Sequence, residues 1–186
     1  KMKFLKFLSI IFISLTIPIK ADSNKNFINQ LVDGEKLIFI RHAYAPGTGD
    51  PNNFNLNDCL TQRNLNKDGR KQAQKIGEFF KKNNIKIEKV LSSEWCRCKE
   101  TAEIAFDDYS TKNFLNSFYS LKYEKNKSKQ IKDLNDYIRQ FKSDKNLILV
   151  THYVLISEVL NYAPSSGEIV VSDKNFNIIG SIKINY

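Results

Sequence analysis

The chain has 186 residues, enough for one ordinary domain with a hydrophobic core but too few for a large multidomain protein. Its 29 lysines and arginines against 20 acidic residues give a formal net charge of +9 at pH 7, which favours anionic partners. Because the lysines are scattered and no recognisable nucleic-acid-binding module is present, we expect no nucleic acid partner.

The first 21 residues have the pattern of a secretory signal peptide. Three lysines within the first six residues precede an apolar run at 7–19, and Ala21 is a small residue at a plausible cleavage point. The run is shorter than the roughly 20 residues of a typical transmembrane helix, and an uncleaved anchor is the alternative. We therefore predict export to the periplasm or the medium, a single mature domain at 22–186, and no stable membrane anchor after cleavage.

A polar segment at 22–33 leads into a predicted strand at 35–40, which ends at the pair Arg41-His42. An aliphatic run that ends at polar residues is typical of a buried parallel strand. Residues 43–64 then form a long loop rich in Gly, Pro, Asn and Asp. A loop of this length in a compact domain is unusual and tends to be functional.

Apolar residues recur at helical spacing in the next segment, so we predict a helix over 67–82 with Asn66 as its N-cap. A second strand is expected at 87–91. The Ser92-Ser93 pair then predicts the cap of another helix, which runs through residue 105.

The second half of the chain continues this alternation of helices and strands. Residues 107–126 are aromatic-rich and irregular in pattern. Beyond them we expect a helix at 131–141, a strand ending at Thr151, a short helix at 154–161, a turn at 164–167, and a closing hairpin of strands at 168–171 and 177–183. This order predicts an α/β fold: a single-domain three-layer α/β/α sandwich whose mostly parallel sheet has helices on both faces.

The only two histidines of the chain, His42 and His152, each follow one of the apolar strands. Ligand sites of open α/β sheets lie at the carboxyl ends of the strands, so we expect both imidazoles at one site. Arg97 falls in the first turn of the helix after the second strand, where free backbone N–H groups favour an anion. With Arg41 it offers two guanidinium groups that bind phosphate oxygens bidentately. For either histidine alone, an ordinary core position is the alternative.

The three cysteines indicate one disulfide bond and one free thiol, as expected for an exported chain. Cys59 can pair with Cys96 or with Cys98, whereas a bridge between Cys96 and Cys98 would close a strained ring. A catalytic cysteine is an alternative, but it would need one of the two histidines as its base.

Four segments resemble the histidine phosphatase superfamily, which includes the cofactor-dependent phosphoglycerate mutases, and the resemblance extends over about residues 36–171. Arg41-His42-Ala43 resembles the family's Arg-His-Gly, and Val150-Thr151-His152 resembles its Val-x-His segment. The family's Leu-Thr-x-x-Gly-x-x-Gln-Ala helix is matched by Leu65-Asn66-Lys67-Asp68-Gly69-Arg70-Lys71-Gln72-Ala73. Its Ser-x-x-x-Arg-x-x-x-Thr-Ala segment is matched by Ser92-Ser93 through Arg97-Cys98-Lys99-Glu100-Thr101-Ala102. All four stand in the family's order and spacing.

The resemblance implies a hydrolase, a metal-independent phosphatase that cleaves a phosphomonoester or phosphoramidate through a phosphohistidine on His42. Arg41, Arg97 and His152 match the family's pocket for phosphate oxygens. No metal or other cofactor is implied, because the arginines supply the positive charge. In the long loop, Arg63 and Asn64 are further candidates for substrate and phosphate contacts, with ordinary loop structure as the alternative.

The sequence departs from the family pattern in two places. Ala43 replaces a glycine, as in some exported subgroups, which is tolerable if the backbone there has a negative φ. The general acid that protonates the leaving group is not evident. The candidates are Glu94, Glu124 and Glu168, with Asp50 and Asp58 in the long loop as others.

The expected substrate is therefore a small phosphorylated compound. Some exported relatives with the Arg-His-Ala variant act on phosphorylated sugars of lipopolysaccharide, which makes an envelope phosphosugar the candidate by analogy. A non-catalytic phosphate-binding or regulatory domain of the same fold is the alternative function, because alkoxide departure is slow without proton donation.

Overall fold

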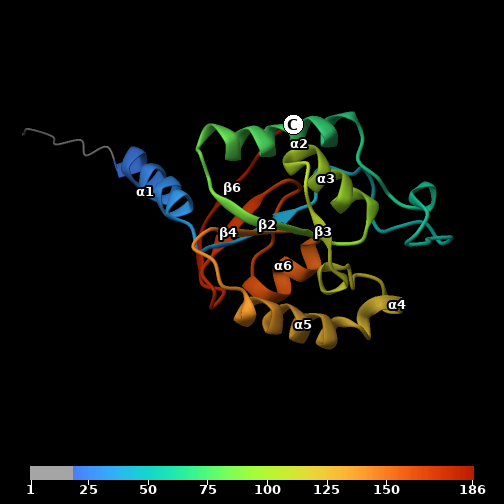
Figure 1. Cartoon of the computed structure of the whole chain (residues 1–186). Helices are drawn as coiled ribbons and strands as arrows, with labels where there is room; N and C mark the ends of the chain where they lie inside the picture. The colour runs from blue at the N-terminus through green and yellow to red at the C-terminus, as the bar shows by residue number, and fades with distance from the viewer. Residues whose placement is uncertain (1–18) are drawn as a thin grey trace, which may run out of the picture.

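A computed structural model of the chain describes residues 19–186 (Figure 1). Its elements are α1 (Ile19–Asp33), β1 (Leu37–Arg41), the 3₁₀ turn η1 (Cys59–Thr61), α2 (Lys67–Lys82), β2 (Ile87–Ser92), α3 (Cys96–Phe106), β3 (Ser110–Thr111), the 3₁₀ turn η2 (Asn113–Leu115), α4 (Leu121–Glu124), α5 (Lys127–Gln140), β4 (Asn146–Thr151), α6 (Tyr153–Leu160), β5 (Ile169–Ser172) and β6 (Ile178–Ile182).

The strands form one six-stranded mixed sheet in the order β3-β2-β4-β1-β5-β6. The pairings of β1 with β4, β4 with β2, and β2 with β3 are parallel, whereas β5 and β6 add an antiparallel hairpin beside β1. The first four strands therefore end at the same edge of the sheet, and this edge carries the residues that follow β1, β2 and β4.

Helices cover both faces of the sheet, α2 and α3 on one side and α5 and α6 on the other (Figure 1). Alternate residues of each strand point to opposite faces. In β1, Ile38 and Ile40 pack with α2 and α3, whereas Leu37 and Phe39 pack with α5 and α6. All four are fully buried. The predicted three-layer α/β/α sandwich is confirmed.

Helix α2 has the predicted bounds and the predicted cap. The Asn66 side chain accepts a hydrogen bond from the backbone N of Gly69 (2.9 Å), which satisfies one free donor of the first turn. Gly77 lies against α3 so closely that a Cβ would come within 2.4 Å of the Ala105 carbonyl oxygen. The sequence pattern thus sets the helix, and this glycine sets how near the two helices pack.

Residues 22–33, expected as a polar approach segment, belong to helix α1. Leu31 is fully buried, and Phe27, Ile28 and Val32 pack against the same core. These four residues form a short apolar stripe along one side of α1. Polar residues surround the stripe, so the average hydropathy of the segment does not reveal it. The predicted signal peptide at 1–21 lies outside the described residues except for 19–21, which begin α1, so export stays a prediction.

Two further differences from the predicted elements concern the start of α3 and the aromatic segment that follows it. Ser92 and Ser93 do not cap α3; the helix begins at Cys96 with Trp95 at the N-cap position and no side-chain cap bond. The aromatic segment 107–126 holds β3, η2 and α4 rather than being wholly irregular.

Within residues 19–186, no helix has the length and apolar character that a membrane crossing needs.

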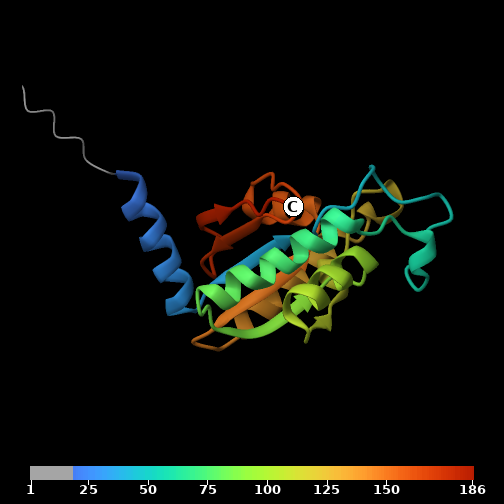
Figure 2. The same cartoon turned by 90° about the horizontal axis from the view of Figure 1, so that it is seen from above.

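The long loop and α1 lie at opposite ends of the molecule, as both views of the cartoon show (Figures 1 and 2). The loop therefore extends from the carboxyl edge of the sheet, where the candidate site lies.

Candidate active site

The parallel pairing of β1 with β4 brings the two histidines together. Arg41 and Thr151 are partners in the ladder. The residue directly after β1, His42, donates its backbone N–H to the Thr151 carbonyl (2.9 Å). The ring centroids of His42 and His152 are 5.6 Å apart at an angle of 66°. Both rings are buried, so the two strand ends form one site, as the sequence predicted.

The hydrogen bond of His42 fixes which of its ring nitrogens is free. Its Nδ1 lies 2.8 Å from the Ala43 carbonyl oxygen. Because a carbonyl can only accept, Nδ1 carries the proton and Nε2 keeps a lone pair. Burial, first of all, and then the positive charge of Arg97 lower the pKa of His42 well below its usual value, outweighing the bond to Ala43. The imidazole is thus neutral and can act as a nucleophile.

Side chains of α2 and α3 hold the backbone just after His42. The Ala43 N–H donates to Thr101 Oγ1 (3.0 Å), and the Tyr44 N–H donates to Gln72 Oε1 (2.8 Å). Ala43 is not among the residues with positive φ, so alanine is compatible with this position. A Cβ on Gly69 would come within 2.0 Å of the Tyr44 carbonyl oxygen. Gly, Gln and Thr of the sequence motifs therefore support the nucleophile rather than contact substrate.

His152 is oriented by two partners. Arg97 Nη2 lies 3.4 Å from Nδ1, and Ser93 Oγ lies 2.8 Å from Nε2. Since a guanidinium only donates, Nδ1 accepts and Nε2 donates to Ser93. Ser93 in turn donates to Asn116 Oδ1 (3.1 Å). Burial first, and the charge of Arg97 second, lower the pKa of His152 well below its usual value, so this ring is neutral too.

The two arginines each keep a buried donor that no protein group accepts. Arg97 is 3% exposed, and Arg41 donates from Nη1 to the Pro164 carbonyl (2.9 Å). Their Nε atoms are two of the three buried side-chain polar atoms without a partner among the described residues, the third being Oδ1 of Asn64. Buried donors without partners are costly, and an anion at this place would satisfy them.

A cavity of about 670 Å³ opens at this edge of the sheet. Its charged part is lined by Arg41, Arg63, Arg97 and Asp50, beside the neutral rings of His42 and His152. Its other wall is aromatic. The rings of Phe54 and Trp95 stack at 5.1 Å, and Tyr123 meets both edge-on. The cavity thus joins a cationic end suited to a phosphate and an aromatic wall suited to an apolar or ring-shaped leaving group.

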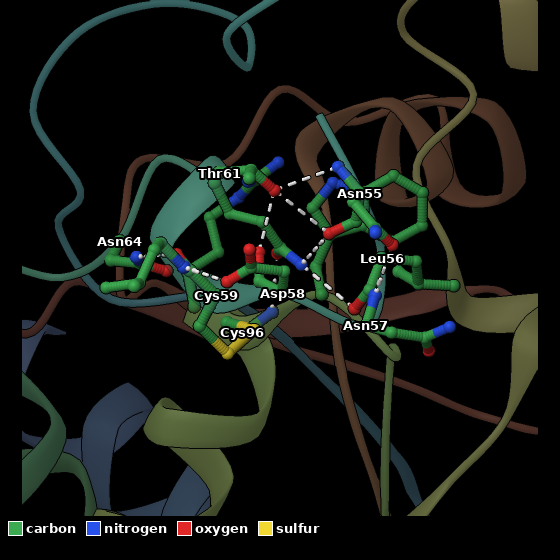
Figure 3. Close-up of a disulfide and its surroundings, with 12 residues drawn as sticks. Asn55, Leu56, Asn57, Asp58, Cys59, Thr61, Asn64 and Cys96 are labelled. Carbon is green, nitrogen blue, oxygen red and sulfur yellow. Dashed lines mark hydrogen bonds between the residues drawn. A yellow bond between two sulfur atoms is a disulfide. The ribbon is translucent and has the colours of Figure 1, made fainter. Parts of the chain in front are cut away.

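A disulfide bond ties the long loop to the start of α3 (Figure 3). The structure pairs Cys59 with Cys96, one of the two predicted pairings, and Gln62 Oε1 also accepts from the Cys96 N–H (2.9 Å). Arg97 is the next residue, so the bond holds the loop beside this cavity-lining arginine. The third cysteine, Cys98, is buried and free, and burial raises its pKa to about 12. It is a thiol and not the thiolate that a catalytic cysteine needs.

The two loop candidates for substrate contacts lie in different places. Arg63 lines the cavity, and its guanidinium donates to the carbonyls of Gly49 (2.8 Å) and Ala45. Asn64 does not line the cavity; its amide donates to the Cys59 carbonyl (2.6 Å) next to the disulfide (Figure 3). Asn64 therefore stabilises the loop in this structure.

The three glutamates expected as general acids all lie off the cavity lining. Glu94 accepts from Asn116 Nδ2 (2.6 Å). Glu124 is exposed at the end of α4. Glu168 is fully buried, and its carboxylate accepts from the Tyr162 hydroxyl (2.6 Å) and the backbone N–H of Ser165 (2.7 Å). Burial would raise the pKa of Glu168, but these bonds lower it, so Glu168 is an ionised structural group.

Of the two loop aspartates, Asp58 accepts from the Leu60 N–H (3.0 Å) and caps η1. Asp50 lines the cavity and binds Arg97 with both carboxylate oxygens (2.7 and 3.3 Å). Sequence reasoning missed Ser93 and Asn116 as partners of the site. Ser93 had a signal, because it is the serine that stands four residues before Arg97 in the Ser-x-x-x-Arg segment, whereas Asn116 lies in an irregular segment and had none.

Comparison with known families gives one match. Residues 37–116 match the histidine phosphatase superfamily (branch 1). This segment includes β1, the long loop, α2, β2 and α3, and therefore His42 and Arg97. No sequence among the curated proteins is significantly similar to this chain.

Several solved structures share the fold at low sequence identity. The protein histidine phosphatase SixA complexed with tungstate has a TM-score of 0.54 at 16% identity, covering 79% of this chain and 96% of that chain. The proposed phosphohistidine phosphatase SixA from Agrobacterium tumefaciens has a TM-score of 0.56 at 18% identity, covering 80% and 98%. A proposed α-ribazole-5'-P phosphatase from Escherichia coli str. K-12 substr. MG1655 has a TM-score of 0.57 at 16% identity, covering 75% and 91%. The family model thus matches less than half of the chain, and the solved structures show that its fold is shared.

Proposed function

We propose that this protein is a phosphatase that hydrolyses a phosphomonoester or phosphoramidate through a phosphohistidine on His42. The observation that carries this proposal is the neutral imidazole of His42, its Nε2 lone pair free, in one cavity with Arg41, Arg97 and His152. The matched family and the phosphatase names of the structural neighbours agree with it.

In the first step, His42 Nε2 attacks phosphorus while the bond from phosphorus to the leaving oxygen or nitrogen breaks. Arg41 and Arg97 bind the non-bridging oxygens, and the neutral His152 positions Arg97 through its Nδ1. In the second step, water attacks the phosphohistidine, the P–N bond breaks, and inorganic phosphate leaves. The charges of the two guanidinium groups stabilise the negative charge of both transition states.

The same charges keep the nucleophile in its reactive form. An imidazolium has no lone pair at Nε2, so protonation would stop the reaction. Placing two cations and a buried environment around His42 disfavours protonation, and the phosphate then neutralises those cations when it binds. One set of residues thus activates the nucleophile and binds the substrate.

We extend the proposal to the substrate and the compartment. The aromatic wall formed by Phe54, Trp95 and Tyr123 suits a ring-bearing leaving group, such as a sugar, since pyranose faces pack on aromatic rings. Ala43 after His42 agrees with the exported Arg-His-Ala subgroup. Export is also supported by the Cys59–Cys96 disulfide, because such bonds persist in oxidising compartments.

The test is release of p-nitrophenol from p-nitrophenyl phosphate by the purified protein and by His42→Asn. Asparagine keeps an N–H near the Ala43 carbonyl but has no nucleophilic nitrogen. We expect His42→Asn to lower kcat by at least about 10³-fold while its melting temperature stays close to that of the parent. Mass spectrometry after rapid quenching in alkali, in which the P–N bond of phosphohistidine survives, should find phosphate on His42 during turnover.

Arg70→Lys is the matched control, because Arg70 is a surface residue that pairs with Glu100 away from the cavity, and it should keep full activity. Binding of inorganic phosphate without turnover by the folded parent protein would favour the non-catalytic alternative instead.

A further inference from the structure

The cavity contains a single acidic side chain among the described residues that line it, and this is Asp50. Asp50 comes from the long loop and not from the second half of the chain, where the glutamate candidates Glu124 and Glu168 lie. We propose that Asp50 is the proton donor to the leaving group. The inference rests on the phosphatase function proposed above and names the residue that completes it.

Asp50 occupies Arg97 Nη1 and Nη2, whereas Arg97 Nε has no partner, so a phosphate that binds Nε together with Nη2 competes with Asp50. Its Oδ1 accepts from Arg97 Nη1 (2.7 Å), and its Oδ2 lies 3.3 Å from Nη2. Oδ2 also accepts from Trp95 Nε1 (3.0 Å). Two carboxylate oxygens on a guanidinium fork have the geometry of two phosphate oxygens on the same fork. A substrate phosphate that binds Arg97 therefore displaces the Asp50 carboxylate and leaves it next to the phosphate.

This exchange changes the charge around Asp50. Burial would raise the pKa of Asp50, but in the free protein its bonds to Arg97 and Trp95 lower it, so the carboxyl is ionised. When a phosphate dianion takes Arg97, Asp50 loses its cation and gains an anionic neighbour, and both changes raise its pKa. Besides Arg97, the other charged or titratable groups that line the cavity are Arg41, His42, Arg63, Tyr119, Lys122, Tyr123, His152 and Tyr153. Substrate binding thus favours the protonated form that a general acid needs.

The backbone on the N-terminal side of Asp50 permits the displacement. Gly47 and Gly49 both have positive φ (+88° and +69°), and a Cβ on Gly49 would meet nothing within 4 Å. Hydrogen bonds from Arg63, to the Gly49 carbonyl (2.8 Å) and from its N–H to Asp50 Oδ1 (3.1 Å), hold this part of the loop, whereas Cys59 further along is bound covalently to α3. The Asp50 side chain is 17% exposed, so it can exchange protons with water.

The proton balance closes over the two steps. In the first, the Asp50 carboxyl gives its proton to the leaving oxygen as the P–O bond breaks and the His42 Nε2–P bond forms, which releases a neutral alcohol. In the second, the Asp50 carboxylate takes a proton from the attacking water as the P–N bond breaks. The products are the alcohol and phosphate, and both His42 and Asp50 return to their starting forms.

The experiment compares leaving groups. p-Nitrophenolate departs without a proton, whereas the alkoxide of glycerol 2-phosphate needs one. We expect Asp50→Asn to lower kcat/KM for glycerol 2-phosphate by about 10²–10⁴-fold and for p-nitrophenyl phosphate by less than about fivefold. Asp58→Asn is the matched control, because it removes the same charge from the same loop at a residue off the cavity, and it should leave both rates unchanged.

Each outcome decides a different point. An equal loss for both substrates in Asp50→Asn would mean that Asp50 only positions Arg97, and no loss for either would mean that it has no role; both results overturn the inference while the phosphatase function stands. If the parent protein cleaves neither substrate and forms no phosphohistidine, the proposed function fails and the inference with it.

Discussion

The imidazole rings of His42 and His152 lie 5.6 Å apart at the carboxyl ends of two neighbouring parallel strands. They differ in the partners that fix them. His42 donates from Nδ1 to the carbonyl of the next residue, whereas His152 donates from Nε2 to Ser93. The first ring thereby keeps the lone pair on Nε2 that the proposed attack on phosphorus needs, and the second is placed beside Arg97. This difference in tautomer, and not in burial, assigns the two histidines different roles.

The shape of the Arg97 side chain should matter as much as its charge. Arg97→Lys keeps one positive charge but lacks the planar guanidinium fork that binds two phosphate oxygens through parallel hydrogen bonds. We expect it to lower kcat/KM for p-nitrophenyl phosphate by about 100-fold, which corresponds to the loss of one or two charge-assisted hydrogen bonds. The inhibition constant of inorganic phosphate should rise in parallel. A variant with unchanged rate and phosphate affinity would show that Arg97 does not bind the phosphoryl group.

The two buried histidines should make the folded state less stable at mildly acidic pH. The pKa of each is lowered on folding, chiefly by burial, so below about pH 6.5 the unfolded chain binds protons that the folded chain does not. The free energy of unfolding should therefore fall as pH falls, by about 1.4 kcal/mol per pH unit for each histidine.

Urea unfolding at pH 7 and at pH 5.5 measures this loss, in a range above the titration of the carboxylates. His42→Asn should show about half of the pH dependence, because one of the two buried imidazoles is gone. A stability that stays constant over this range would contradict the neutral, buried state of both rings.

The Cys59–Cys96 bond should contribute both stability and order in the loop. It closes a loop with a sequence separation of 37, for which the chain-entropy relation gives about 4 kcal/mol as an upper figure. We expect the double variant Cys59→Ser/Cys96→Ser to have a lower melting temperature and a higher KM for p-nitrophenyl phosphate. The loop that carries Asp50 and Arg63 would then be held by hydrogen bonds alone.

Dithiothreitol supplies the matched comparison. It should lower the melting temperature of the parent protein to that of the double variant and leave the double variant itself unchanged. If dithiothreitol did not change the melting temperature of the parent protein, the disulfide bond would be absent or would not stabilise the folded state.

Glu168 should act on stability and not on proton transfer. Its carboxylate holds the Tyr162 hydroxyl and the Ser165 N–H, which flank the turn whose Pro164 carbonyl accepts from Arg41. In Glu168→Gln an amide N–H₂ would face one of these donors, so we expect a loss of about 1–3 kcal/mol in the free energy of unfolding. Any loss of activity should be equal for aryl and alkyl phosphates. Glu124→Gln, at an exposed position, is the control and should change neither.

A selective loss of alkyl phosphate cleavage in Glu168→Gln would instead make Glu168 the proton donor. That result would also conflict with its position outside the cavity lining.

The sequence by itself determined the order of the elements and the edge of the sheet at which the site lies. Helix α2 has the predicted bounds and Asn66 cap, because helical spacing and capping are local properties of the chain. The apolar strands before His42 and His152 are equally local signals, and the parallel arrangement of such strands places their ends together. Helix α1 was not predicted. Its apolar stripe is short, and the core on which it packs is formed by strands and helices distant in the sequence.

The tertiary structure alone decided which side chains of the site contact one another. The tautomers of His42 and His152, the choice of Cys96 over Cys98, and the place of Asp50 on Arg97 all depend on contacts between segments far apart in the sequence. The long loop has no periodicity from which to read such contacts, since its conformation follows from hydrogen bonds and a disulfide and not from an apolar pattern. A carboxylate in this loop and a glutamate elsewhere look alike in the sequence, and only packing brings one of them into the cavity.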